Sequence, residues 1–354
     1  MMERMKKRIL LITALTAFAA GVFAQDYTFS NHNIVPFSLN PASTGTAYAV
    51  RFAANYRMQW PMLDNAYHTL RVSYDQNVYK HMCSIGVAYT YDNMAHGVFQ
   101  TNELDAVYSH TIRLTRDLRH FLRLGVQASL LSNRVNLDKL TFGDQYYAAN
   151  GTILPTTVES FDSDNRTFFD FSVGASYVYE GRLNVGFAVF HVSRPDNGFV
   201  EGSQFLERKY VAQVNFSQDL ELNRGLMSSP GSDNYFFANA AYQNQDCFNQ
   251  VMLGAGVCFQ PMIFGVTWKT NITKVFETAS AEKETEEGTA DTGVYFTAVN
   301  IPSLMVGAYY KGLQVYYIFD FNISAKKNGS WSNELSLIYT LPNKKKDLCP
   351  VTYW

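Results

Sequence analysis

The amino-acid sequence predicts an all-β protein, a transmembrane antiparallel β-barrel of about 14 strands with an N-terminal signal peptide. Three observations predict this class. Short segments alternate between apolar and polar residues, and aromatic residues make up 15% of the chain. The mean hydropathy of -0.15 is too polar for a bundle of membrane helices. An outer-membrane barrel combines these features because only one face of each strand meets lipid.

The first 24 residues are predicted to be a cleavable signal peptide. Four basic residues within positions 4–8 precede the apolar run 9–20, and Ala24 closes a small-residue cleavage site before Gln25. The apolar run is shorter than the roughly 20 residues that a transmembrane helix needs. Since no later stretch is a candidate membrane helix, the mature chain would have to enter a membrane as a barrel.

The stretch AYAVRFAANYRMQW, residues 47–60, shows the alternation most clearly. One row holds Val50, Phe52, Ala54, Tyr56, Met58 and Trp60, and the other holds Arg51, Ala53, Asn55, Arg57 and Gln59. In a soluble sandwich the apolar row would face a core, whereas in a membrane barrel it would face lipid and the polar row would face the lumen. Alternation alone does not choose between the two.

The rest of the chain repeats this pattern. The expected strands are 47–60, 66–75, 82–91, 98–113, 120–132, 168–180, 182–191, 206–217, 233–243, 248–259, 262–271, 293–310, 312–322 and 331–341. With both termini in the periplasm, the long joins 139–166, 192–205 and 271–292 fall outside the cell, as in bacterial barrels. The join 221–232 breaks this pattern, because it is long and periplasmic. The polar rows and the barrel topology together favour lipid for the apolar row.

One strand carries an internal proline. Residues 293–310 are expected to form a single strand with a bulge or break at Pro302, because proline cannot donate a ladder hydrogen bond. Splitting this strand would give 15 strands and move the C-terminus to the other side of the membrane.

The expected organisation has four parts: signal peptide 1–24, N-terminal segment 25–46, barrel 47–341 and basic tail 342–354. The N-terminal segment would fold into the lumen or along the rim, as a possible plug. The acidic stretch 277–293 is expected to be a solvated surface loop. The tail is a hypothetical partner contact through Lys344, Lys345, Lys346, Cys349 and Pro350, with a solvated tail as the alternative.

The sequence offers no candidate catalytic, cofactor-binding or metal-binding residues. The seven His residues fit no metal-ligand spacing, and no nucleophile motif or phosphate loop is present. The net charge of -2 gives no case for nucleic acid as a partner. We therefore expect a protein that is not an enzyme and needs no cofactor.

Several motifs follow one another in a distinctive order. SLNPASTG precedes a strand with YRMQW, VSYDQ ends the next strand, and FDFSVGASYVYEGRLNVGFAVFHVSRP forms a central hairpin. VYYIFD and SNELSLIY form late strands before the basic Cys-Pro tail KKKDLCP. In this order the motifs resemble the PorP/SprF family of Bacteroidetes outer-membrane proteins. The acidic insertion 277–293 and the tail beyond Pro350 depart from the family pattern.

The resemblance implies a role in the cell outer membrane, within type IX secretion or the linked gliding motility machinery. Its implied partners are membrane lipid, the periplasmic ring proteins of that system and the C-terminal domains of secreted cargo such as adhesins. The polar inner rows leave open a second function, a passive, porin-like solute channel. A third, an outer-membrane hydrolase, would need a Ser-His pair at the rim that the sequence does not show.

The polar row of the first strand suggests how the N-terminal segment is held. In the barrel, Arg51 and Arg57 would face the lumen and pair with carboxylates of neighbouring strands, beside the sequence LNPASTG. The candidate anchoring residues are Asn40, Pro41, Arg51, Arg57, Gln59 and Asp75.

Overall fold

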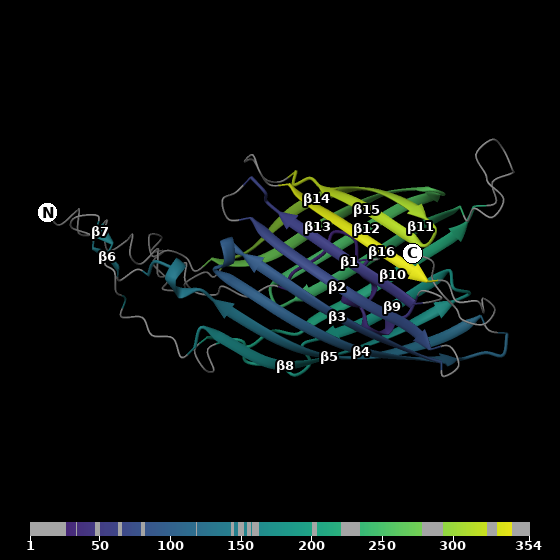
Figure 1. The fold of residues 1–354 in the computed structure, drawn as a ribbon, viewed down its shortest axis with the longest axis horizontal. Helices are drawn as coiled ribbons and strands as arrows, with labels where there is room; N and C mark the ends of the chain where they lie inside the picture. The colour runs from purple at the N-terminus through teal and green to yellow at the C-terminus, as the bar shows by residue number, and fades with distance from the viewer. Residues whose placement is uncertain are drawn as a thin grey trace, which may run out of the picture.

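Fourteen antiparallel strands close into one barrel in the computed structural model (Figure 1). The structure describes residues 26–32, 34–46, 50–62, 66–78, 82–117, 119–142, 145–147, 152–153, 157, 163–199, 204–220, 234–277, 293–323 and 331–341. The expected signal peptide, Gln25, the interior of the acidic stretch and the C-terminal tail with Lys344, Lys345, Lys346, Cys349 and Pro350 lie outside the described residues.

The barrel strands have lengths typical of membrane barrels. They are β1 (Val50–Gln59), β2 (Tyr67–Val78), β3 (Cys83–Met94), β4 (Phe99–Arg113), β5 (His120–Val135), β8 (Asn165–Tyr179), β9 (Leu183–Phe190), β10 (Lys209–Asp219), β11 (Tyr235–Gln245), β12 (Phe248–Phe259), β13 (Met262–Glu277), β14 (Gly293–Tyr310), β15 (Leu313–Asp320) and β16 (Ser332–Leu341). Outside the wall are the short sheet β6 (Tyr146–Tyr147) and β7 (Thr152–Ile153) and the 3-10 turns η1 (Pro36–Ser38), η2 (Pro41–Ser43), η4 (Ala95–Gly97) and η5 (Leu137–Lys139).

Each barrel strand pairs with its neighbours along the chain, and β5 pairs directly with β8. The barrel closes where β1 pairs with β16, from Val50 opposite Leu341 to Gln59 opposite Ser332. The predicted fold class and strand number are therefore confirmed. The largest difference in bounds is at β13, which continues to Glu277 because Gly293–Asn300 of β14 supply a partner for the added residues.

Pro302 lies inside the single strand β14, but the expected bulge or break is absent. The register with β13 is uniform on both sides of Pro302, which lies opposite Trp268. The Pro302 carbonyl accepts a hydrogen bond of 2.8 Å from the Phe321 N–H, just beyond the end of β15. The edge of Pro302 that lacks an N–H therefore faces β15 where that strand ends, and the ladder with β13 is undisturbed.

The apolar row of β1 faces outward. Phe52 and Tyr56 are 47% and 41% exposed on the barrel surface, whereas Arg51 and Arg57 are 5% and 4% exposed inside it. The same alternation of exposed apolar and buried polar residues recurs on the other strands. An apolar surface of this extent is unfavourable in water, so the outer face is built to contact lipid.

The two ends of the barrel differ. The strand ends connected by the long joins β5–β8, β9–β10 and β13–β14 lie at one end, here called the long-loop end, with β6 and β7 beside it (Figure 1). The joins β8–β9, β12–β13 and β14–β15 are short and lie at the other end, the short-turn end, where β16 finishes. β10 ends at Asp219 and β11 begins at Tyr235 at this end too, so the long join 221–232 is the exception that the sequence predicted. No helix in the described part of the chain has the length and hydropathy needed to cross a membrane.

A charge placed on the outer face should destabilise the barrel. Val126 lies near the middle of β5 and is 52% exposed. Val126→Arg should lower the free energy of unfolding in lipid vesicles by about 2–4 kcal/mol, because the guanidinium would enter hydrocarbon. Val126→Leu is the matched control, and urea titration compares the two. Equal stability of both variants would contradict an outward, lipid-facing Val126.

Candidate functional site

Residues 26–46, here called the luminal segment, run through the inside of the barrel. The chain forms two proline-initiated turns here, η1 and η2, and has no β-ladder of its own. Its first residues contact β9, β10 and β11 at the long-loop end. Its last residues contact β2 at the short-turn end. The luminal segment therefore passes from the long-loop end to the short-turn end before β1 begins.

Apolar contacts hold the middle of the luminal segment. Phe29, Ile34 and Val35 lie in one buried cluster with wall residues such as Phe237 and Ile263. Burying a large apolar side chain contributes roughly 1.5–3 kcal/mol. Two further clusters each contain one residue of the segment, Leu39 with Phe190, Val211 and Met252, and Phe37 with Ala88 and Val107. The lumen is thus partly apolar, which the polar rows of the sequence did not predict.

Two wall carboxylates bind the segment at Ser30. The Ser30 hydroxyl donates to Asp320 Oδ2 at 2.6 Å, and the Ser30 N–H donates to Glu334 Oε2 at 2.6 Å. Lys269 Nζ donates to the same Asp320 oxygen at 2.8 Å. All of these groups are buried, so the cation offsets the charge of a carboxylate that is shielded from water.

Arg57 contacts both the wall and the segment. Its Nη1 donates to the Thr28 carbonyl at 2.7 Å, and its Nη2 donates to Asp320 at 3.0 Å. Glu334 lies directly opposite on β16, with its Oε2 4.0 Å from Arg57 Nη1. Gln59 differs: it ends β1, is partly exposed and makes no hydrogen bond to the described part of the segment.

At the short-turn end, Arg51 and Asp75 form a bidentate pair with N–O distances of 2.7 and 2.8 Å. Asp75 also accepts the Gly45 N–H at 2.7 Å, and Thr46 lies 3.5 Å from the Arg51 guanidinium. Gly45 has a φ of +67°, and a Cβ there would lie 2.4 Å from Ser84 Oγ. Glycine is therefore required both by backbone conformation and by space.

Asn40 and Pro41 lie against β5 and β8. The Asn40 side chain caps η2 by accepting the Ala42 N–H, and its amide donates to the Ala175 carbonyl at 3.1 Å. Gly174 leaves room for Asn40, because a Cβ there would lie 2.1 Å from Asn40 Oδ1. At Gly125, a Cβ would lie 2.3 Å from the Pro41 carbonyl carbon. Gly125 and Gly174 of the wall thus leave the space into which η2 packs, and this pair of glycines is here called the seat of η2.

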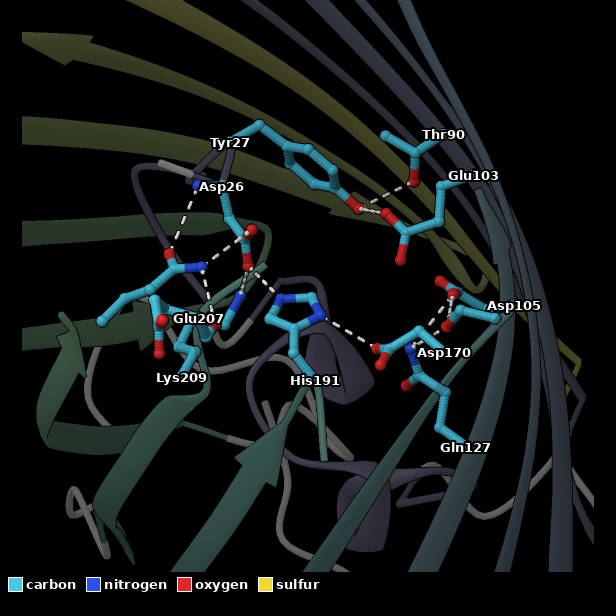
Figure 2. A network of polar contacts seen from close by, with 12 residues as sticks. Asp26, Tyr27, Thr90, Glu103, Asp105, Gln127, Asp170, His191, Glu207 and Lys209 are labelled. Atoms are coloured by element: carbon cyan, nitrogen blue, oxygen red, sulfur yellow. Dashed lines mark hydrogen bonds and ion pairs between the residues drawn. The ribbon is translucent and has the colours of Figure 1, made fainter. Parts of the chain in front are cut away.

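His191 holds the first described residue of the segment (Figure 2). Its Nε2 is 2.8 Å from Asp26 Oδ2, and its Nδ1 is 2.9 Å from Asp170 Oδ2. Lys209 binds the same Asp26 oxygen. Burial alone would lower the pKa of His191, but the charge of Asp26 and the bonds to both carboxylates raise it to about 9. Burial would raise the pKa of Asp26, but His191 and Lys209 hold it well below its usual range.

Tyr27 is the next residue of the luminal segment, and its side chain makes polar contacts with the barrel wall. Its hydroxyl donates to Glu103 at 2.7 Å and accepts from Arg71 at 2.9 Å, as Figure 2 shows for the Glu103 bond. Arg71 in turn pairs with Asp105 at 2.8 Å. Burial and the charge of Glu103 raise the pKa of Tyr27 well above its ordinary value, so the hydroxyl stays protonated.

The pKa of His32 is shifted in the opposite direction from that of His191. Its Nε2 is 3.1 Å from the amide nitrogen of Gln243. Burial, and then the positive charges of Lys269, Lys209 and Arg57, lower the pKa of His32 to about 3. His32 is therefore neutral at pH 7, whereas His191 is charged.

Sequence reasoning identified the wall residues better than their partners. It placed Arg51, Arg57 and Asp75 in the lumen, but it missed the pairing of Asp26 with His191, which is 165 residues away along the chain. The expected strand 182–191 placed His191 on the same row as the outward-facing Val185 and Phe187. In the structure β9 ends at Phe190 and His191 has a φ of +57°, so the alternation stops before His191 and its side chain is buried inside the barrel.

A closed barrel with an apolar outer face, a polar and apolar interior and an internal N-terminal segment defines an outer-membrane β-barrel protein. The family of the type IX secretion system membrane protein PorP/SprF matches residues 21–339. The chain belongs to this family, and its location is the outer membrane. Comparison with curated protein sequences gave no significant match.

Solved structures of other outer-membrane barrels are similar at low identity. Omp33 of Acinetobacter baumannii aligns with a TM-score of 0.42 and 9% identity over 84% of this chain and 100% of its own. A FadL homologue of Pseudomonas aeruginosa gives 0.40 and 11% over 85% and 92%. The KdgM porin gives 0.33 and 8% over 82% and 99%.

Filling the seat of η2 should displace the luminal segment. Gly125→Val would place side-chain atoms where the Pro41–Ala42 backbone lies, and overpacking of this kind costs about 1–3 kcal/mol. Hydrogen exchange of residues 40–46 should become faster. Ala106→Val, which adds two methyl groups to the outer face of the neighbouring strand, is the control. Unchanged exchange in Gly125→Val would contradict the close contact.

The two histidines should give stability a maximum near neutral pH. The raised pKa of His191 means that its contribution is full below about pH 6.5 and is lost as pH rises through about 9. The lowered pKa of His32 means that stability falls as pH drops below 6.5, because the unfolded chain takes up the proton first. The free energy of unfolding should be measured as a function of pH. His191→Gln should remove its decrease between about pH 6.5 and 9, and His32→Gln should remove its decrease below pH 6.5. Unaltered slopes in these variants would refute the assignment.

Proposed function

We propose that the chain acts by binding, as an outer-membrane component of the type IX secretion system. Its short-turn end meets periplasmic ring components, and its rims and loops assist the export of surface proteins and adhesins through contacts with cargo C-terminal domains. Membership of the PorP/SprF family supports the assignment to the type IX secretion system. The internal segment supports binding rather than transport through the lumen.

The observation that carries this proposal is the occupation of the lumen. Residues 29–46 of the luminal segment are almost all buried where the structure describes them. They contact strands on opposite sides of the wall, as with Ser30 on β15 and β16 and Asn40 on β8. We propose that residues 25–46 are a plug, which leaves the exposed ends and loops as the working surfaces.

The remaining parts of the chain follow from this orientation. The long-loop end lies outside the cell, and residues 1–24 are removed as a signal peptide. The tail 342–354 begins where β16 ends, at the short-turn end, and so lies in the periplasm. Lys344, Lys345, Lys346, Cys349 and Pro350 are then placed to meet a periplasmic partner.

Deleting the gene should reduce the secreted proteins and surface adhesins of the cell, measured by proteomics of the medium and cell surface. Complementation with a chain lacking residues 342–354 should restore the barrel but not the co-purification of periplasmic ring proteins. The full-length chain is the control. An unchanged secretome in the deletion strain would exclude the proposed role.

The alternative function, a passive solute channel, predicts a different electrical behaviour. The plugged barrel should be silent in planar lipid bilayers, while removal of residues 26–46 should produce steady conductance if the barrel still closes. Circular dichroism and heat-modifiable migration verify that the shortened barrel is folded. Steady conductance of the full-length protein would favour the channel instead.

A further inference from the structure

Three donors at the ends of three neighbouring strands converge on the carboxylate of Asp26, and Figure 2 shows two of them, His191 and Lys209. His191 lies directly after β9, Lys209 is the first residue of β10 and Gln245 is the last residue of β11. His191 Nε2 is 2.8 Å and Gln245 Nε2 is 3.2 Å from the carboxylate oxygens, and Lys209 binds the oxygen that His191 contacts. Together they surround the carboxylate at the long-loop end.

The barrel wall holds these donors without help from the luminal segment. Asp170 on β8 accepts from the other ring nitrogen of His191, and the Ser193 hydroxyl donates to Asp170 at 2.8 Å. Lys209 Nζ lies 4.7 Å from the centre of the Phe190 ring. Gln245 also donates to the Glu207 carbonyl at 3.3 Å. The site is therefore preorganised by groups that would remain if Asp26 moved away.

The charges of the wall favour an anion at this position. Lys209 and protonated His191 are cations, while the carboxylate of Asp170 accepts from His191 and that of nearby Glu207 pairs with Arg194. Without Asp26 the pKa of His191 would fall, because the charge of Asp26 is the largest influence that raises it. The His191 side chain is 7% exposed and that of Lys209 13%. A carboxylate in this shielded site pairs with Lys209 and favours the charged form of His191, so it binds more tightly than a neutral group.

The geometry points to a binding site for a peptide carboxylate formed by His191, Lys209 and Gln245, which Asp26 occupies within the same chain. The natural ligand class is the side-chain or C-terminal carboxylate of an extended peptide that reaches the long-loop end. The Asp26 side chain is 16% exposed. Its contacts with His191, Lys209 and Gln245 are separate from the apolar clusters of the segment, so a competing carboxylate has to displace only these contacts. The apolar clusters of Phe29, Ile34 and Leu39 stay in place.

Purified Asp26→Ala protein in detergent tests the site. N-acetyl-aspartate amide presents a side-chain carboxylate, N-acetyl-glycine presents a terminal carboxylate, and N-acetyl-asparagine amide is the neutral control. At constant ionic strength, at least one carboxylate should bind at least tenfold more tightly than the neutral control by calorimetry. Binding should be weaker in the wild type, where Asp26 competes, and lost in Asp26→Ala/Lys209→Met.

Equal binding of the neutral compound, absence of carboxylate binding, or binding that survives in the double variant would overturn the proposal. If Asp26→Ala does not fold, the wild type provides a second measurement. High concentrations of N-acetyl-aspartate amide or of N-acetyl-glycine should then speed amide exchange of residues 26–28, and N-acetyl-asparagine amide should not. Unchanged exchange with every compound would also overturn it. These tests do not depend on secretion, so their failure is distinct from failure of the proposed function.

Discussion

The interior of this protein depends on the pairing of buried charges across the barrel wall. Three arginine–aspartate pairs each join two strands, and each pair also contacts the luminal segment through at least one of its members. The pairs are Arg51–Asp75, Arg57–Asp320 and Arg71–Asp105, and the contacts on the segment are Gly45, Thr28 and Tyr27. A buried pair contributes little net stability, but loss of one partner leaves an uncompensated charge that costs about 3–5 kcal/mol. The pairs therefore fix where the luminal segment lies more than how strongly the barrel is held together.

Stability of the interior comes from a different set of contacts. The apolar side chains of Phe29, Val35 and Leu39 remove water from the lumen, while the ionic groups specify position and direction. The seat formed by Gly125 and Gly174 allows the backbone of η2 to approach the wall more closely than any side chain would permit. Charged residues thus fix the position of the luminal segment, and apolar residues stabilise it. The glycines allow its backbone to approach the wall closely.

The sequence was sufficient to predict the wall and insufficient to predict what fills it. Alternation in stretches such as residues 47–60 reports the two environments of a strand, so the strand number could be predicted. The outward direction of Phe52 followed only once the alternation was combined with the barrel topology. Pro302 was expected to disturb β14, but its unpaired edge lies where β15 has already ended, and only the register of three strands reveals this. The luminal segment has no periodicity, and its partners, such as His191 for Asp26, become neighbours only when the barrel closes. The chain belongs to the PorP/SprF family of type IX secretion membrane proteins, and the segment inside the barrel is the observation behind the binding role proposed above.

The central claim is that buried contacts hold the luminal segment inside the barrel, and amide hydrogen exchange in lipid-reconstituted protein tests it most directly. Residues 29–46 should exchange as slowly as the barrel strands. In Arg57→Ala, residues 26–32 should exchange at least tenfold faster while the strands stay protected, whereas exposed Arg113→Ala should match the wild type. Rapid exchange of residues 29–46 in the wild type, or full protection in Arg57→Ala, would contradict the account.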